Sequence, residues 1–103
     1  MKMIGKNRNS NDTAVIGAGI AMNAATSTTI VTLVSTDSML IMTNDGNQDL
    51  FIKLQAASVD DDKKGFILFK GTTATLDLEA VTFVGEVSGI TKNGLTTIYT
   101  TVF

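Results

Sequence analysis

Few residues of this chain have the type and spacing that would support chemistry. The sequence contains no histidine and no cysteine, so the usual pairs of a nucleophile and a base are absent. A serine–lysine or paired-carboxylate site would have to use residues such as Ser35, Asp37, Ser38 and Asp77, none of which lies in a recognisable local signature. We therefore predict that the chain is not an enzyme and has neither catalytic residues nor a cofactor.

One polar segment has the oxygen-rich composition of a calcium site. Residues 44–47 (NDGN), with Asp49 close behind, offer carboxylate and amide oxygens. A helical calcium loop needs a closing glutamate, and the corresponding position counted from Asp45 holds Ala56. A hairpin turn with positive φ at Gly46 accounts for the same residues. The turn is the favoured interpretation, and we predict no metal site.

A second acidic cluster, Asp60-Asp61-Asp62, precedes Lys63 and Lys64. Neighbouring carboxylates repel one another unless they are solvated or neutralised. The run could gather a cation or face a basic partner, but an exposed loop is the favoured interpretation.

The segment AVIGAGIAM resembles the opening of a dinucleotide site, in which glycines let a pyrophosphate approach a helix N-terminus. Gly17 and Gly19 have the required spacing, but Met22 occupies the third small position. Asp37 lies where a ribose-binding acid is expected, yet no strand–helix–strand pattern follows. Close packing of small residues is the favoured interpretation.

From Thr28 onward, short apolar segments alternate with turn signals. The segments read TTIVTLV, SMLIMT, DLFIKLQ, GFILFK, TATLDLE, FVGEVS and LTTIYTTVF. The turn signals between several of them are Asp45-Gly46, Lys64-Gly65, Lys70-Gly71 and Asn93-Gly94. This spacing is typical of an antiparallel sandwich or barrel. We predict an all-β antiparallel β-sandwich, jelly-roll-like or partly barrel-like, with an extended N-terminal arm.

Two segments alternate clearly enough to assign their faces. In the segment 73–79, the residues predicted to point inward are Ala74, Leu76 and Leu78. In DLFIKLQ, the predicted inward residues are Leu50, Ile52 and Leu54. The residues of DLFIKLQ predicted to point outward or towards a sheet edge are Phe51, Lys53 and Gln55.

The chain divides into a polar start and an apolar body. We predict an N-terminal arm with a small-residue-rich lead segment at 1–27 and a β-sandwich body at 28–103. The 103 residues suffice for one hydrophobic core but not for two. The segment 13–27 is ambiguous from sequence, and extended or irregular structure is favoured because its glycines weaken a helix.

Charge is unevenly distributed between these two parts. Residues 1–12 carry a net charge of +2, and the remainder carries −4. A basic arm on an acidic body indicates that the arm binds something other than its own domain, whereas a solvated tail is the alternative. The residues predicted to contact a partner are Met1, Lys2, Met3, Ile4, Lys6 and Arg8.

Composition argues against two other classes of partner. With eight basic residues, one tyrosine and no tryptophan, the chain lacks the basic stripe with interleaved aromatic residues that binds nucleic acid. The apolar stretch AVIGAGIAMNAA is interrupted by Asn23 and is too short to span a bilayer. We predict neither nucleic-acid binding nor membrane insertion, and the polar start lacks the apolar core of a signal peptide.

Residues 28–103 run in the order TTIVTLV, SMLIMTNDGNQ, DLFIKL, GFILFK, GTTATLDLE and GEVSGITKNGLTTIYTTVF. This order resembles small β-rich virion proteins of tailed bacteriophages, namely capsid decoration, head-fibre and accessory head proteins. The resemblance implies a structural protein of the virion, assembled in the host cytoplasm, most simply a capsid decoration (cement) protein. Its implied partners are the major capsid protein, neighbouring virion proteins, or further copies of the same chain.

Two other functions stay open from the sequence. The first is a head–tail connector or tail component that forms a ring. The second, from a different class, is a carbohydrate- or receptor-binding β-sandwich, although such sites usually stack sugars on aromatic rings and Tyr99 is the only tyrosine.

Overall fold

The computed structural model describes residues 14–103, which form nine strands and one short helix. The strands are β1 (Val15–Ile16), β2 (Ile20–Met22), β3 (Thr28–Leu33), β4 (Met39–Asn44), β5 (Leu50–Lys53), β6 (Phe66–Leu68), β7 (Thr73–Asp77), β8 (Gly85–Thr91) and β9 (Thr96–Val102). The helix is α1 (Leu78–Val81). No helix among the described residues is long and apolar enough to cross a membrane.

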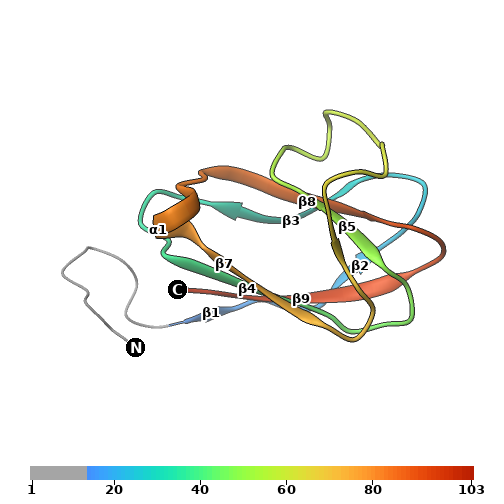
Figure 1. Cartoon of the computed structure of the whole chain (residues 1–103), viewed down its shortest axis with the longest axis horizontal. Coiled ribbons are helices and arrows are strands. Elements are labelled where there is room, and N and C mark those ends of the chain that lie inside the picture. Colours follow the sequence, from blue (N-terminus) through green and yellow to red (C-terminus); the bar gives the residue numbers. More distant parts are fainter. Residues whose placement is uncertain (1–13) are drawn as a thin grey trace.

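The strands form two antiparallel sheets that pack face to face (Figure 1). One sheet has the order β1-β9-β4-β7, with β2 also paired to β9, and the other has the order β3-β8-β5-β6. The pairs β2–β9, β3–β8, β4–β7 and β5–β6 are nested around the β5–β6 connection, which is the wrapping of a jelly roll. The prediction of an all-β antiparallel sandwich is confirmed.

The core lies between the sheets and follows from the alternation of apolar residues along each strand. Twelve buried apolar side chains form one cluster: Met22, Ile30, Leu33, Leu40, Met42, Leu50, Ile52, Leu68, Leu78, Val87, Ile98 and Val102. Ala74 and Leu76 of β7 pack against this cluster as the sequence predicts. Strand β7 is shorter than the predicted segment 73–79 because the Asp77 side chain accepts hydrogen bonds from the Glu79 and Ala80 amides and so caps α1.

A β-bulge changes the face assignment in β3. Simple alternation over TTIVTLV groups Thr29, Val31 and Leu33 on one face and Ile30 on the other. In the structure, the register with β8 shifts between Thr29 and Val31, and Ile30 and Leu33 are both buried. The extra residue of the bulge rotates the strand between them, so two residues of opposite parity reach the same core.

The glycine turns have different causes. Gly94 has a φ of 65°, as an Asn-Gly turn requires. Gly46 does not have positive φ, so the predicted reason for that glycine is wrong. A Cβ at Gly46 would instead overlap Thr96 Oγ1, and close packing is what requires glycine there.

Small residues of the lead segment pack closely against β9. A Cβ at Gly17 would lie 2.8 Å from Thr100 Oγ1, and one at Gly19 would lie 2.9 Å from a ring carbon of Tyr99. Met22 of β2 is fully buried. No helix follows these glycines, so the structure agrees with close packing and not with a dinucleotide site.

Candidate functional site

The side chains considered for chemistry serve local structure instead. Asp37 Oδ2 accepts a hydrogen bond from the Val34 amide at 2.8 Å, and Ser38 Oγ donates to the Phe103 carbonyl. Ser35 lies in the same turn, whereas Asp77 caps α1. Within residues 14–103, no group of three or more carboxylates is arranged to hold a metal ion.

The candidate calcium ligand Asn44 is fully buried and completely used by hydrogen bonds. Its Nδ2 donates to the carbonyls of Gln48 and Leu68, and its Oδ1 accepts from Thr96 Oγ1 at 2.6 Å. Asp49 Oδ1 accepts from the Lys70 amide. These two residues therefore link the β4–β5 connection to the β6–β7 connection and to the start of β9. None of these contacts requires a cation.

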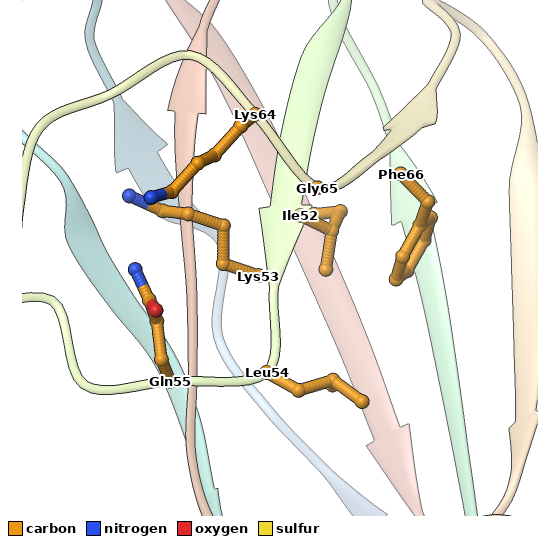
Figure 2. Close-up of a pocket in the computed structure, with 7 residues that line it drawn as sticks. All are labelled: Ile52, Lys53, Leu54, Gln55, Lys64, Gly65 and Phe66. Carbon is orange, nitrogen blue, oxygen red and sulfur yellow. The ribbon is translucent and has the colours of Figure 1, made fainter.

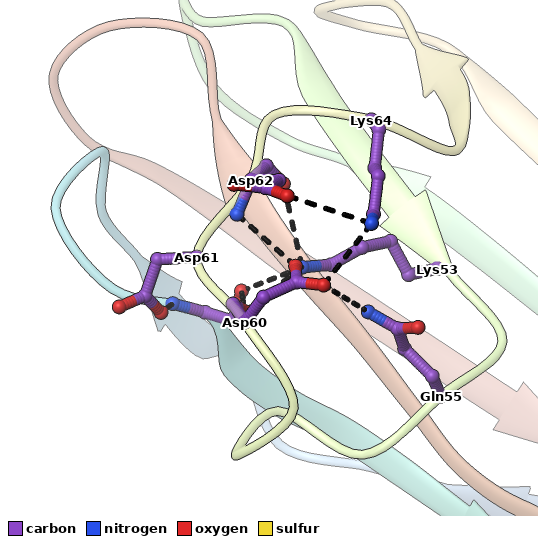
Figure 3. Close-up of polar contacts among 7 residues, drawn as sticks. Lys53, Gln55, Asp60, Asp61, Asp62 and Lys64 are labelled. Atoms are coloured by element: carbon purple, nitrogen blue, oxygen red, sulfur yellow. Dashed lines mark hydrogen bonds and ion pairs between the residues drawn. The ribbon is translucent and has the colours of Figure 1, made fainter.

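The densest polar cluster surrounds Lys53 at the end of β5 (Figure 3). Lys53 is 4% exposed, and its Nζ lies 3.0 Å from Asp60 Oδ1. The same ammonium donates to Ser27 Oγ and to the carbonyls of Asp60 and Asp62. An ammonium has three hydrogens, so these four acceptors leave it no donor for a ligand.

Asp60 is the centre of this cluster. Its Oδ2 lies 3.1 Å from Lys64 Nζ and also accepts from Gln55 Nε2, while its Oδ1 accepts from the Asp62 amide. Hydrogen bonds from Lys53 and then from Lys64 favour the charged carboxylate and hold the pKa of Asp60 well below its usual range. The Asp60 carboxylate raises the pKa of Lys64 by the same interaction.

Two predictions from the sequence are corrected here. Alternation along the strand places Lys53 outward or towards an edge, but the β5–β6 loop folds over it and supplies its anionic partner. Asp61 and Asp62 are exposed as expected, whereas Asp60 is only 25% exposed and pairs with Lys53. Asp61 Oδ1 also accepts from the Ser27 amide and joins the loop to the β2–β3 connection. The signal in the sequence was a lone lysine in an apolar strand followed by an acidic run.

A shallow pocket of about 330 Å³ lies beside this cluster, between β5 and the start of β6. Figure 2 shows the Lys53, Lys64 and Gln55 side chains on one side of β5, with Leu54 and Phe66 on the other. Because the amines at its rim are held by Asp60, the pocket offers no free reactive group. We assign the cluster a structural function, which is to fix the β5–β6 loop.

The sheet edges are the surfaces that stay open in the described part of the chain. Strands β3 and β6 are the edges of one sheet. In the other sheet, β7 is one edge and the short strands β1 and β2 form the opposite edge. Large apolar side chains at least partly exposed on the surface are Val15, Ile16, Val34, Val59, Phe66, Ile67, Phe69, Val81, Val84, Leu95 and Tyr99. The predicted contact residues Met1, Lys2, Met3, Ile4, Lys6 and Arg8 lie outside the described residues. The sequence could not reveal the edges, because strand order is not readable from strand pattern.

No protein-family model and no curated sequence matches the chain. Among solved structures, the fold is similar to one from Bacillus endospore appendages, which are described as a novel family of disulfide-linked pili. The TM-score is 0.50 with 16% sequence identity, and the match covers 98% of this chain and 95% of that chain. At this identity the similarity shows a shared fold.

The predicted function as a bacteriophage virion protein is wrong. The solved structure that matches nearly the whole chain comes from a pilus and not from a phage capsid. The same finding overturns the capsid decoration function, the major capsid protein as partner and the location in a virion. The physical reason is that an order of short strands specifies a sandwich, and one sandwich fold serves many unrelated functions.

Proposed function

We propose that this chain is a non-enzymatic structural subunit that assembles with further copies of itself into a fibre. Its fold is similar over nearly its whole length to a structure from endospore pili. The polar side chains that could have formed a reactive site are engaged in turns, caps and the Lys53–Asp60 cluster. A compact sandwich of this kind acts through its surface.

The free edge at β7 is the observation that carries the proposal. Thr73–Asp77 pairs in continuous register with β4 and with no other described strand. Native proteins usually protect such an edge with lysine, proline, a bulge or a very short strand. Strand β7 has none of these features, since its five residues are TATLD and the register is unbroken.

The other edges are better protected against pairing. Strands β1, β2 and β6 have two or three residues each, and β3 contains a bulge. A strand of a second copy added beside β7 would extend the β1-β9-β4-β7 sheet and satisfy the unpaired amides and carbonyls of β7. When each copy contacts the next through two different surfaces, repetition produces an open fibre, unless the rotation between neighbouring copies closes the chain of copies into a ring.

Contacts between copies of this chain would be free of disulfides. The endospore pili are described as disulfide-linked, whereas this sequence contains no cysteine. Assembly would therefore rest on strand pairing and side-chain packing, and we expect it to be insensitive to reducing agents.

Sedimentation velocity and negative-stain electron microscopy of the full chain test this proposal. We expect linear assemblies that grow with concentration and persist in dithiothreitol. Thr75→Lys places a charge on the exposed face of β7 and should shift the chain to small species, because the charge hinders edge pairing. Ser58→Lys is the matched control, since Ser58 is exposed in the β5–β6 loop away from β7.

Two results would overturn the proposal at different points. Fibres that form equally well with Thr75→Lys would exclude the β7 edge. A full chain that stays monomeric at every concentration tested would exclude self-assembly altogether. Circular dichroism of both variants checks that neither substitution has unfolded the sandwich.

A further inference from the structure

The end of the sandwich that carries α1 contains an apolar groove surrounded by acidic residues. The groove has a volume of about 330 Å³, and its lining includes Val34, Asp37, Leu78, Glu79, Phe83 and Val84. Val34 and Val84 are 53% and 59% exposed. Val81 of α1 is 43% exposed on the same end.

Charge is segregated along the long direction of the molecule. The acidic residues at the α1 end are Asp37, Asp77, Glu79 and Glu86. All five lysines of the described residues lie instead in or beside connections of the other half: Lys53, Lys63, Lys64, Lys70 and Lys92. Those lysines are balanced there by five aspartates, Asp45, Asp49, Asp60, Asp61 and Asp62. The α1 end therefore carries the net negative charge of the described chain.

The sequence that precedes the described residues has the complementary composition. Residues 1–12 carry a net charge of +2, with the apolar side chains Met1, Met3 and Ile4 next to Lys2, Lys6 and Arg8. Apolar side chains suit the lining of the groove, and basic side chains suit its acidic surroundings.

Residues 1–13 join the body at the same end. Val15 of β1 pairs with Val102 of β9, and the Phe103 carbonyl accepts from the Ser38 amide at 2.6 Å. The Ser38 carbonyl in turn accepts from the amide of Leu78, which lines the groove. Because β1 runs antiparallel to β9 and Val15 lies opposite Val102, residues 1–13 are connected to the sheet at the α1 end.

We propose that residues 1–13 of one copy occupy the α1 groove of a second copy. This inference rests on the proposed self-assembly. Thirteen extended residues span at most about 43–47 Å, whereas a neighbouring sandwich of four or five strands is only about 19–24 Å across. A copy aligned in the same sense beside the first would thus present its groove within reach.

Disulfide trapping between singly substituted chains tests this assignment without background, since the sequence contains no cysteine. Full-length Met3→Cys protein is mixed with full-length Val84→Cys protein, oxidised, and analysed on a non-reducing gel. We expect the mixed disulfide to form several-fold more than in a mixture of Met3→Cys with Leu95→Cys. Leu95 is the matched control because it is 73% exposed in the β8–β9 turn at the other end.

A charge substitution adds a second, independent readout. Lys6→Glu in the Met3→Cys chain should lower the yield of the mixed disulfide, because the α1 end carries negative charge. The yield with the unaltered charges should also fall at 1 M salt, where the Debye length is only about 3 Å and charge attraction is largely screened.

The outcomes separate this inference from the proposed function. Equal trapping at Val84→Cys and Leu95→Cys, in samples that sediment as assemblies, overturns the groove assignment and leaves self-assembly standing. A Met3→Cys/Val84→Cys double variant that closes within one chain at low concentration assigns the groove to its own residues 1–13 and overturns the exchange between copies. Samples that stay monomeric and show no trapping overturn both.

Discussion

Lys53 Nζ and Asp60 Oδ1 lie 3.0 Å apart in a place where only 3% of the lysine side chain is exposed. The two residues come from the end of β5 and from the loop that follows it, and Ser27 joins them from the β2–β3 connection. A buried ammonium is costly unless it is paired and hydrogen-bonded. The pair therefore decides where the β5–β6 loop rests on the sandwich.

The first prediction concerns removal of one partner of this pair. Asp60→Leu leaves the buried ammonium of Lys53 without its carboxylate and should lower the urea midpoint markedly. Lys53→Met/Asp60→Leu should recover much of that loss, because replacing both charges by apolar groups removes the unpaired charge. Asp62→Asn is the control, since its side chain is 70% exposed and pairs with Lys64. A double variant no more stable than Asp60→Leu would contradict this account.

The second prediction is a loss of stability in acid. A carboxyl group whose pKa is lowered by folding stabilises the native state at pH values above its unfolded pKa, and this contribution is lost as the pH falls through the folded value. For Asp60 the ordinary value is 3.8 and the folded value is lower. We expect little change from this group between pH 5 and 8 and a decline below about pH 4.

The matched measurement is a series of urea titrations of the wild type and Asp60→Asn from neutral to acidic pH. The variant is less stable at neutral pH, and the difference between the two proteins should shrink as the pH drops below about 4. A difference that stays constant down to pH 2 would show that ionised Asp60 does not stabilise the fold.

The third prediction concerns the glycine that ends the β5–β6 loop. Gly65 has a φ of 103°, and a Cβ there would overlap the Ile52 carbonyl oxygen. Gly65→Ala should therefore destabilise the protein by about 1–3 kcal/mol or more, because backbone strain and a steric overlap add. Gly71→Ala is the control, since φ is 72° but no atom lies within 4 Å of its Cβ. We expect the control to cost about 1 kcal/mol, and equal losses in urea denaturation would argue against the overlap.

Strand existence and the all-β class could be predicted from the sequence because apolar alternation and turn residues are local signals. Leu50 and Ile52 face the core, and Ala74 and Leu76 pack against it, as their spacing predicts. The Asn93-Gly94 turn could be predicted for the same reason, since glycine tolerates the positive φ that Gly94 adopts wherever it lies in the chain.

The local pattern failed where a distant segment changed the balance. Lys53 alternates like an exposed residue, and only the fold brings Asp60 and Ser27 to its ammonium. Asn44 belongs to a polar turn in sequence, yet it is buried because the Gln48 and Leu68 carbonyls and Thr96 satisfy its amide group. Ile30 and Leu33 share the core only because a bulge against β8 alters their parity.

The sequence by itself determined that this chain is a cysteine-free, strand-rich sandwich with a basic start and an acidic body. Composition and the alternation of apolar residues do not depend on contacts with residues distant in the sequence, so both can be read directly. Only the tertiary structure decided that β7 is an open edge and that the acidic residues 37, 77, 79 and 86 gather at the α1 end. Strand order arises from contacts between segments distant in sequence, and surface function depends on that order.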